Sequence, residues 1–189
     1  MAILHSAAEE SLRNRVMLAL AYFGALRREE LVRLEVSDID FSRRLITLRP
    51  DTTKGGRSRI VSYANSVGSN LVLYVAERHR LDRRPGPLFL STSNRNRGAS
   101  LSKWQWSKTV KTIADRAGVP GFSTHTLRHL RLTHLARAGW RLHEIAAYAG
   151  HRNPKSTMTY LHLSGAELTS RIAQTVGPRD ESVNAVLFQ

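Results

Sequence analysis

A histidine and an arginine stand three residues apart in the segment HTLRH, residues 125–129. If a helix begins near Thr124, His125 and Arg128 lie on one face of it, because residues three apart on a helix are neighbours. Arginine presents two parallel N–H donors to phosphate oxygens, and histidine donates a hydrogen bond or moves a proton near neutral pH. The pair suits a phosphodiester whose negative charge grows during reaction. Taken alone, it is equally compatible with a basic helix end.

A second group of candidate residues lies in the C-terminal part of the chain. Gly150 is expected to end an apolar helix, so that His151 projects from the helix terminus. Tyr160 follows nine residues later. Because a phenol has a pKa of about 10, its hydroxyl needs cationic neighbours or a base to act as a nucleophile. Considered singly, His151 and Tyr160 are more typical of structural residues.

The N-terminal part contributes two cations and a carboxylate. Arg27 follows a predicted core helix directly, and Glu30 comes three residues later. Glu30 can orient Arg27 or another cation, or complement the dipole at a helix start. Lys54 lies at the tip of a predicted hairpin, where a flexible lysine can reach into a groove and protonate a leaving oxygen. Without the other candidates, Arg27 and Lys54 would be interpreted as solvated cations.

The elements that must position these residues are mainly helical. Apolar periodicity predicts helices over residues 9–24, 28–34, 65–81, 103–117, 126–138, 142–150, 155–161 and 165–174. Two predicted strands, 45–49 and 59–63, flank a polar, glycine-containing stretch typical of a hairpin. A turn follows at 82–87 and a polar, arginine-rich loop at 91–100. The sequence therefore predicts a mainly α fold with a small antiparallel β-sheet (α+β) and no interior domain break.

The overall charge points to a polyanionic partner. The chain has 29 Lys+Arg against 15 Asp+Glu, a formal net charge of +14. Nucleic acid is the commonest partner of so basic a domain, although a basic protein without such a role is the alternative. The absence of cysteine excludes disulfides and cysteine nucleophiles and fits a reducing compartment. The longest apolar run, 16–26, is too short to span a membrane, and no signal peptide is visible.

In their order and spacing, these candidates resemble the catalytic domain of the tyrosine recombinase (phage integrase) family. The resemblance covers about residues 9–168 and rests on four motifs and the tyrosine. GALRREEL (24–31) resembles the first arginine box, KGGRSRIV (54–61) the β-hairpin lysine motif, HTLRH (125–129) the second arginine box, and AGH (149–151) the usual LGH. Each motif alone is weak, but the ordered set is specific. Ala149 replaces the usual leucine, which should alter packing rather than chemistry.

The resemblance implies a catalytic role for each residue. Tyr160 would attack a scissile phosphate and form a 3′-phosphotyrosine, while Lys54 would protonate the departing 5′ oxygen. The others would act on the phosphate charge: Arg27, Arg128 and His151 by hydrogen bonding its non-bridging oxygens, His125 by assisting them or accepting the tyrosine proton, and Glu30 in support. No cofactor or metal is implied, because the cations of the protein fill that electrostatic role.

The same resemblance implies the partners and the domain organisation. The expected partner is double-stranded DNA, bound by a homotetramer. For the isolated domain without DNA, a monomer is the alternative. Neither a membrane nor a small-molecule substrate is expected. We expect a cytoplasmic protein of prokaryotic, phage or mobile-element origin. Residues 1–176 would form the catalytic domain, and residues 177–189 a tail that docks on a neighbouring protomer or on its own domain. The N-terminal core-binding domain of the family would be absent.

Further basic residues are candidates for contacts with the DNA backbone that position the protein without reading sequence. They are Arg95, Arg97, Lys103, Lys108 and Lys111. Trp104 and Trp106 could stack on bases, but packing in a core or an interface is the preferred interpretation.

Two other functions remain open at the level of sequence. A type IB topoisomerase-like enzyme would use the same tyrosine chemistry to relax supercoils. A catalytically silent DNA-binding module would keep the basic surface alone. The spacing of the motifs favours a recombinase over the first, and the presence of every proposed catalytic residue argues against the second.

Overall fold

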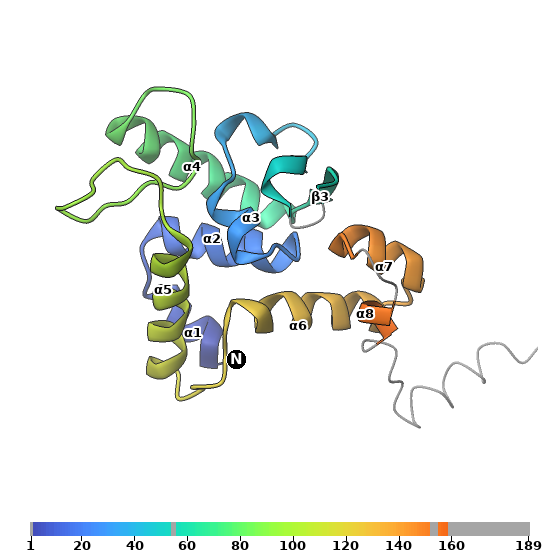
Figure 1. The fold of residues 1–189 in the computed structure, drawn as a ribbon. Helices are drawn as coiled ribbons and strands as arrows, with labels where there is room; N and C mark the ends of the chain where they lie inside the picture. Colours follow the sequence, from blue (N-terminus) through green and yellow to red (C-terminus); the bar gives the residue numbers. More distant parts are fainter. Residues whose placement is uncertain (1, 54–55, 152–154, 159–189) are drawn as a thin grey trace, which may run out of the picture.

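The computed structural model describes residues 2–53, 56–151 and 155–158 (Figure 1). Its helices are α1 (Ala2–Ala8), α2 (Leu12–Phe23), α3 (Arg28–Val32), α4 (Asn65–Leu81), α5 (Lys103–Arg116), α6 (Thr124–Arg137), α7 (Leu142–Ala149) and α8 (Lys155–Met158), with 3-10 turns at Val36–Asp38 and Pro50–Thr52. The predicted α+β class is confirmed. None of the described helices is long and apolar enough to cross a membrane.

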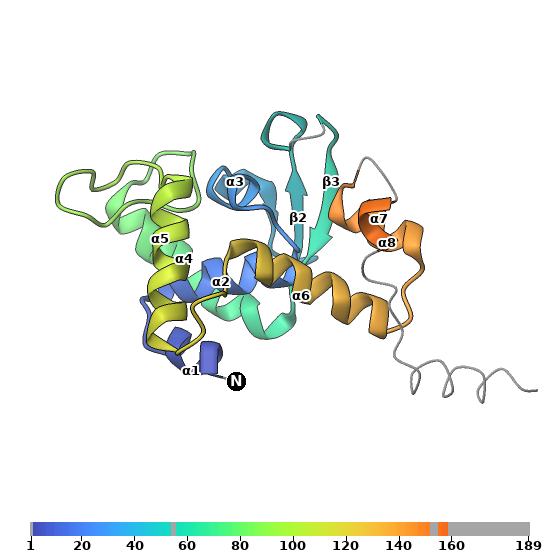
Figure 2. The ribbon, with the colours of Figure 1, turned by 60° about the horizontal axis from the view of Figure 1, so that its bottom comes forward.

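A three-stranded antiparallel sheet stands beside the helices (Figure 2). Its strands are β1 (Ile39–Asp40), β2 (Leu45–Leu48) and β3 (Arg59–Ser62), and the register pairs Leu48 with Arg59. The predicted hairpin of β2 and β3 is confirmed. β1 was not predicted, because two residues are too few to show an alternating pattern.

Helix α2 forms the centre of the core, with α4 and α6 packed against it (Figure 1). Met17 and Leu20 of α2 are fully buried, as are Ile46 of β2 and Trp106 of α5. A smaller apolar cluster, which includes Leu132 and Ile145, joins α6 to α7. These contacts fix α2, α6 and α7 relative to one another, which matters because the ends of these helices carry the candidate residues.

Two helix starts differ from the sequence prediction because capping side chains set them. The helix predicted from residue 9 begins at Leu12, after Ser11, whose side chain accepts a hydrogen bond from the Asn14 backbone. A separate short helix, α1, precedes it. Helix α6 begins two residues earlier than predicted, after a capping box formed by Ser123 and Thr126. His125 and Arg128 therefore share α6, as expected.

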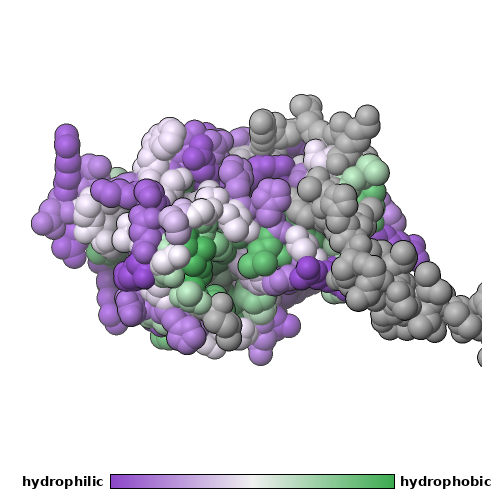
Figure 3. Space-filling model, turned by 90° about the horizontal axis from the view of Figure 1, so that it is seen from below, coloured by the Kyte–Doolittle hydropathy of each residue, from purple (hydrophilic) through white to green (hydrophobic). Residues whose placement is uncertain are grey.

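An apolar hollow of about 620 Å³ lies where α1, α2 and α6 meet. Its lining includes Leu4, Leu18, Tyr22, Phe122 and Leu130. Apolar atoms gather on the face of the molecule seen from below (Figure 3). The tail at 177–189 and the predicted helix at 165–174 lie outside the described residues.

Candidate active site

Two helices end in the same kind of turn, and the candidate residues follow directly. At the end of α2, the Leu26 and Ala25 amides donate to the Ala21 and Tyr22 carbonyls at 3.0 and 3.1 Å, which is the Schellman pattern. The left-handed residue of this turn is Ala25, with φ 47°, and Gly24 before it stands at the end of the helix, as predicted. An alanine in this region is strained, by about 1–2 kcal/mol. Arg27 comes next in the chain.

The end of α7 repeats this arrangement. The His151 amide donates to the Ala146 carbonyl at 3.0 Å, and the Gly150 amide to Ala147 at 3.1 Å. Gly150 has φ 63°, and a Cβ there would stand 2.9 Å from Nη1 of Arg59. A glycine is therefore required twice over, by its conformation and by the close approach of a side chain. The predicted projection of His151 from the helix end is explained by this turn.

Arg128 bridges the two turns. Its Nη1 donates to the Ala25 carbonyl at 2.5 Å and its Nη2 to the Ala149 carbonyl at 2.6 Å. The residue is 5% exposed. Both acceptors lie at helix C-terminal ends, where the backbone dipole favours a cation, and this explains how a guanidinium is accommodated in the interior. Arg128 thereby holds the segments that carry Arg27 and His151.

Arg27 is held by Glu30 and by the α7 turn. Its Nη1 lies 2.8 Å from Oε1 of Glu30, and its Nη2 donates to the Gly150 carbonyl at 3.2 Å. The Arg27 amide also donates to Oε2 of Glu30 at 2.8 Å. The sequence left open whether Glu30 orients a cation or caps a helix; it does both.

Arg59 of β3 is the second cation bound to Glu30. Its Nη1 and Nη2 donate to the two carboxylate oxygens at 2.9 and 2.7 Å, and its Nε donates to the Tyr148 carbonyl at 3.0 Å. Burial raises the pKa of Glu30, but the hydrogen bonds from Arg59 and Arg27 outweigh it and hold the pKa at about 2. Glu30 is therefore ionised at neutral pH and links α3, β3 and the end of α7.

His151 faces the same cations. Its Nδ1 lies 2.8 Å from Oγ1 of Thr157 in α8. Burial, followed by the charges of Arg128, Arg27 and Arg59, lowers the pKa of His151 to about 4. At neutral pH the imidazole is therefore uncharged, mainly because it is buried and in addition because three arginines surround it.

We expect the imidazole of His151 to titrate near pH 4 in the free protein. Because this folded-state pKa lies below the ordinary value of 6.5, the unfolded chain takes up the proton first as pH falls. Stability present above about pH 6.5 should therefore be lost between pH 6.5 and 4 relative to a His151→Gln variant. NMR titration and urea unfolding at several pH values test this. A midpoint at or above 6.5 would show that the cations do not act on His151.

His125 lies at the rim of this cluster. It is exposed, one turn before Arg128 on α6. Burial lowers its pKa, and the charge of Arg28 contributes next. A neutral histidine at neutral pH can accept a proton, so this position remains compatible with either role that the resemblance implies.

Two predicted catalytic residues, Lys54 and Tyr160, lie outside the described residues. The strands β2 and β3 on either side of Lys54 are described, and the α8 segment that precedes Tyr160 packs on α7. Within the described residues, Arg27, Glu30, Arg128 and His151 come together as predicted. No described group of three or more histidine and carboxylate side chains could hold a metal ion.

The predicted backbone contacts are spread over one side of the molecule. Lys103, at the start of α5, pairs with Glu29 at 2.6 Å, and Lys111 pairs with Asp115 at 3.0 Å. Arg95 and Arg97 are exposed in the loop on the α4 and α5 side, opposite α7 (Figures 1 and 2). No contact with DNA follows from these positions alone, and all five stay predictions.

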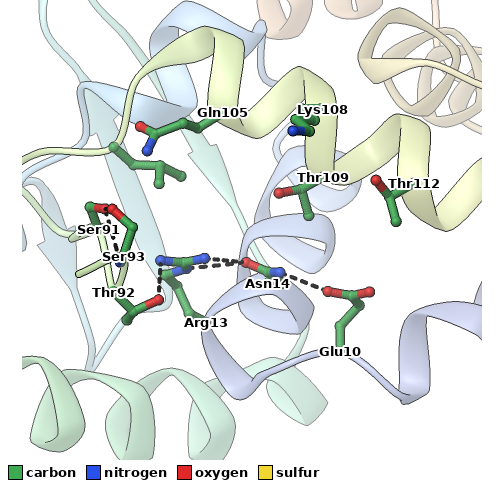
Figure 4. A pocket seen from close by; sticks show the side chains of 11 residues that line it. Glu10, Arg13, Asn14, Ser91, Thr92, Ser93, Gln105, Lys108, Thr109 and Thr112 are labelled. Atoms are coloured by element: carbon green, nitrogen blue, oxygen red, sulfur yellow. Dashed lines mark hydrogen bonds between the residues drawn. The ribbon is translucent and has the colours of Figure 1, made fainter. Parts of the chain in front are cut away.

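Lys108 lines a polar cavity of about 370 Å³ between α2, α5 and the loop at 91–100 (Figure 4). In this cavity Arg13 donates to the carboxamide oxygen of Asn14 at 3.0–3.1 Å and to the Leu90 carbonyl at 2.8 Å. Asn14 donates in turn to Glu10 at 2.7 Å. These bonds tie the loop to α2, so this cavity has a structural explanation apart from the arginine cluster.

The two tryptophans of α5 have different environments. Trp106 is fully buried, which confirms core packing, but Trp104 is 66% exposed and core packing is wrong for it. The guanidinium carbon of Arg28 lies 5.1 Å from the Trp104 ring centroid, and Nζ of Lys103 lies 5.5 Å from it. An exposed indole therefore lies between two cations near the start of α5.

Two residues that hold the site were not singled out from the sequence. Arg59 lies in the KGGRSRIV segment, and its strand position on the same side as buried Val61 marked it as inward-facing. Thr157 carried no such signal, because its role depends on a contact between α8 and His151 that only the folded chain shows.

Comparison with known proteins places this chain in one family. The model of the phage integrase family matches residues 1–167, so the chain belongs to the phage integrase family. Tyrosine recombinase XerC of Bifidobacterium longum is 32% identical over 175 residues, which cover 87% of this chain and 47% of that protein. XerC of Corynebacterium glutamicum is 31% identical over 160 residues, with 85% and 50% covered. The chain thus spans about half the length of these curated relatives.

Solved structures show the same fold. The crystal structure of XerA recombinase is 25% identical with a TM-score of 0.77, covering 93% of this chain and 62% of that one. XerH recombinase bound to its difH substrate is 22% identical, with a TM-score of 0.73 and 91% and 51% covered. The Tn1549 transposon integrase in complex with transposon right end DNA is 16% identical, with a TM-score of 0.74 and 93% and 63% covered. The likeness confirms the predicted catalytic-domain fold.

Proposed function

We propose that this chain is the catalytic part of a site-specific recombinase that cuts and rejoins double-stranded DNA through Tyr160. The observation that carries the proposal is the bridge made by Arg128 between two helix ends, because it fixes Arg27 and His151 beside one another. The donors of Arg27 and His151, which follow the two turns, together with the buried charge of Arg128 between those turns, suit the non-bridging oxygens of a phosphodiester.

In the proposed reaction, the Tyr160 hydroxyl oxygen attacks phosphorus while the bond from phosphorus to the 5′ oxygen breaks. His125 accepts the phenol proton, and Lys54 supplies a proton to the departing 5′ oxygen. Neutral His151 donates a hydrogen bond, and the two arginines offset the added charge. Attack by the 5′-hydroxyl of another strand reverses these steps and releases the tyrosine, so that no bond energy is lost to water.

Family membership favours recombination over the relaxation of supercoils and over silent DNA binding. The relatives are named tyrosine recombinases, and two of the structural neighbours were solved with DNA. A net charge of +14 agrees with a nucleic-acid partner. The proposal includes assembly as a homotetramer on DNA. It leaves the choice between integration and other uses of strand exchange undecided, because the fold does not distinguish them.

The test is the capture of a covalent complex on nicked duplexes that tile the DNA flanking the gene. With EDTA present, a denaturing gel should show a slow-migrating protein–DNA adduct for the wild type. Tyr160→Phe, which removes only the attacking oxygen, should give none while binding DNA equally well. An adduct that persists in the variant would refute the nucleophile, and the absence of any adduct despite binding would favour the silent module.

Trp104 is expected to contribute to DNA binding. Replacing it with alanine should weaken binding by about 0.5–1 kcal/mol, the range for an exposed cation–π contact, because its exposed indole holds the Arg28 and Lys103 cations in place. Fluorescence anisotropy with a labelled duplex measures the loss. Phe41→Ala provides the control, since Phe41 is also exposed (38%) but lies at the end of β1. Equal effects of the two variants would contradict a role for Trp104.

A further inference from the structure

One hydroxyl group in the described residues has a contact with a predicted catalytic side chain but no role in the reaction. Oγ1 of Thr157 lies 2.8 Å from Nδ1 of His151, and Thr157 is 0% exposed. A hydroxyl buried to this degree needs a partner within the protein. The imidazole supplies it, so the contact is a persistent part of the fold and not a surface encounter.

The direction of this hydrogen bond decides what His151 can do. A neutral imidazole has one nitrogen that donates and one that accepts. The non-bridging oxygens of a phosphodiester only accept. Because the surrounding arginines and burial hold the pKa of His151 near 4, the ring is neutral at pH 7, and it can serve the phosphate only through a nitrogen that carries hydrogen. The tautomer of His151 therefore decides which ring nitrogen can donate to the phosphate.

We propose that Thr157 is a positioning residue whose hydroxyl donates to Nδ1 of His151 and thereby keeps the hydrogen on Nε2. Nε2 is then the nitrogen that donates to the scissile phosphate. The inference rests on the proposed function for its consequence in catalysis, but the tautomer itself is a property of the free protein. At metal sites, a histidine ligand is held in one tautomer by a group that hydrogen-bonds its other ring nitrogen. Loss of that group lowers metal affinity or activity by about 10- to 100-fold.

The position of Thr157 in the chain gives this bond a second consequence. Thr157 precedes Tyr160 by three residues and lies in α8, which packs on α7. The segment that leads to the predicted nucleophile therefore also sets the tautomer of the histidine. If α8 moves away from α7, the Thr157 hydroxyl no longer holds the hydrogen of His151 on Nε2, and the segment that leads to Tyr160 moves as well. Cleavage is therefore disfavoured unless His151 is positioned.

The experiment compares three chains. Thr157→Val removes the hydroxyl and keeps the shape, whereas Thr157→Ser keeps the hydroxyl and removes a methyl group. Nitrogen-15 shifts of the His151 ring, measured at pH 7 without DNA and assigned with His151→Gln, report the tautomer. We expect the Nε2–H form in the wild type and in Thr157→Ser, and a mixture in Thr157→Val. Adduct formation should fall about 10- to 100-fold in Thr157→Val and stay within about 3-fold in Thr157→Ser.

Three results would overturn the proposal. The first is an Nδ1–H tautomer of His151 in the wild type, which the ring shifts show without comparison to a Thr157 variant. The second is wild-type cleavage by Thr157→Val. The third is a loss of cleavage in Thr157→Val with the tautomer unchanged, which would show that the residue acts only through packing. If the wild type formed no adduct at all, the proposed function would fail, while the ring shifts would still decide the tautomer.

Discussion

Replacing Arg128 with lysine is expected to slow strand cleavage by about 100- to 1,000-fold, the cost of losing a preorganised donor at a developing charge. Lysine keeps the charge but replaces a planar fork with a single flexible ammonium. It cannot reach the Ala25 and Ala149 carbonyls together, at the 2.5 and 2.6 Å that the guanidinium achieves. The two helix ends should therefore loosen, and Arg27 and His151 should lose their mutual placement.

The measurement is the single-turnover rate of adduct formation on a nicked duplex, at a temperature at which circular dichroism shows the variant folded. Because the net charge is unchanged, non-specific DNA binding should change little. Arg43→Lys is the matched control, since the Arg43 side chain is 78% exposed and its ion pair with Asp40 is long, at 4.0 Å. A cleavage rate of Arg128→Lys within about 3-fold of the wild type would contradict the role of the bridge.

Replacing Glu30 with glutamine is expected to lower the free energy of unfolding by about 3–5 kcal/mol, the usual cost of removing one partner of a buried ion pair. Glu30 is 1% exposed and receives hydrogen bonds from Arg59 and Arg27. Glutamine retains the shape, but it removes the negative charge and turns an amide donor toward a guanidinium. The Arg59 side chain, 8% exposed, would then be a buried cation without its carboxylate.

The dependence of this loss on pH provides an internal check. The pKa of Glu30 is about 2 in the folded chain, against an ordinary value of 4.5 for a glutamate. A depressed carboxyl pKa contributes stability that is present above about pH 4.5 and lost as pH falls toward 2. The difference between wild type and Glu30→Gln in urea unfolding should shrink over that range. Glu35→Gln is the control, because the Glu35 side chain is 39% exposed and its pair with Arg49 should contribute at most about 1 kcal/mol. Equal losses in the two variants would contradict the buried pair.

The fold was largely predictable because its elements carry local signals. α4 has the predicted bounds, and α5 and α7 match within a residue, since apolar periodicity marks all three and Ser102 caps the start of α5. The errors occur where a single side chain decides a boundary. Ser11 starts α2 later than apolar content alone indicates, and Ala25 takes the left-handed position that glycine usually fills. In that turn, tertiary contacts override local preference.

The site was predictable to the extent that its residues lie in recognisable motifs. Arg27, Glu30, Arg128 and His151 were found in this way, and the structure brings them together. What spacing could not show is that backbone carbonyls at two helix ends hold the arginines. Arg59 and Thr157 were missed because each acts through a contact that only the folded chain shows. The strand pattern marks Arg59 as inward-facing but does not show its bond to Glu30, and no pattern predicts the contact of Thr157 with His151.

The central claim is that Tyr160 forms the covalent bond to DNA, and peptide mapping of the trapped adduct tests it most directly. After digestion with nuclease and trypsin, mass spectrometry should find a nucleotide remnant on the peptide of residues 156–171, whose only tyrosine is Tyr160. Fragmentation should place the added mass on that side chain. A remnant on another residue, such as Tyr148 or Tyr22, would contradict the account, because the cation cluster would then serve a different nucleophile.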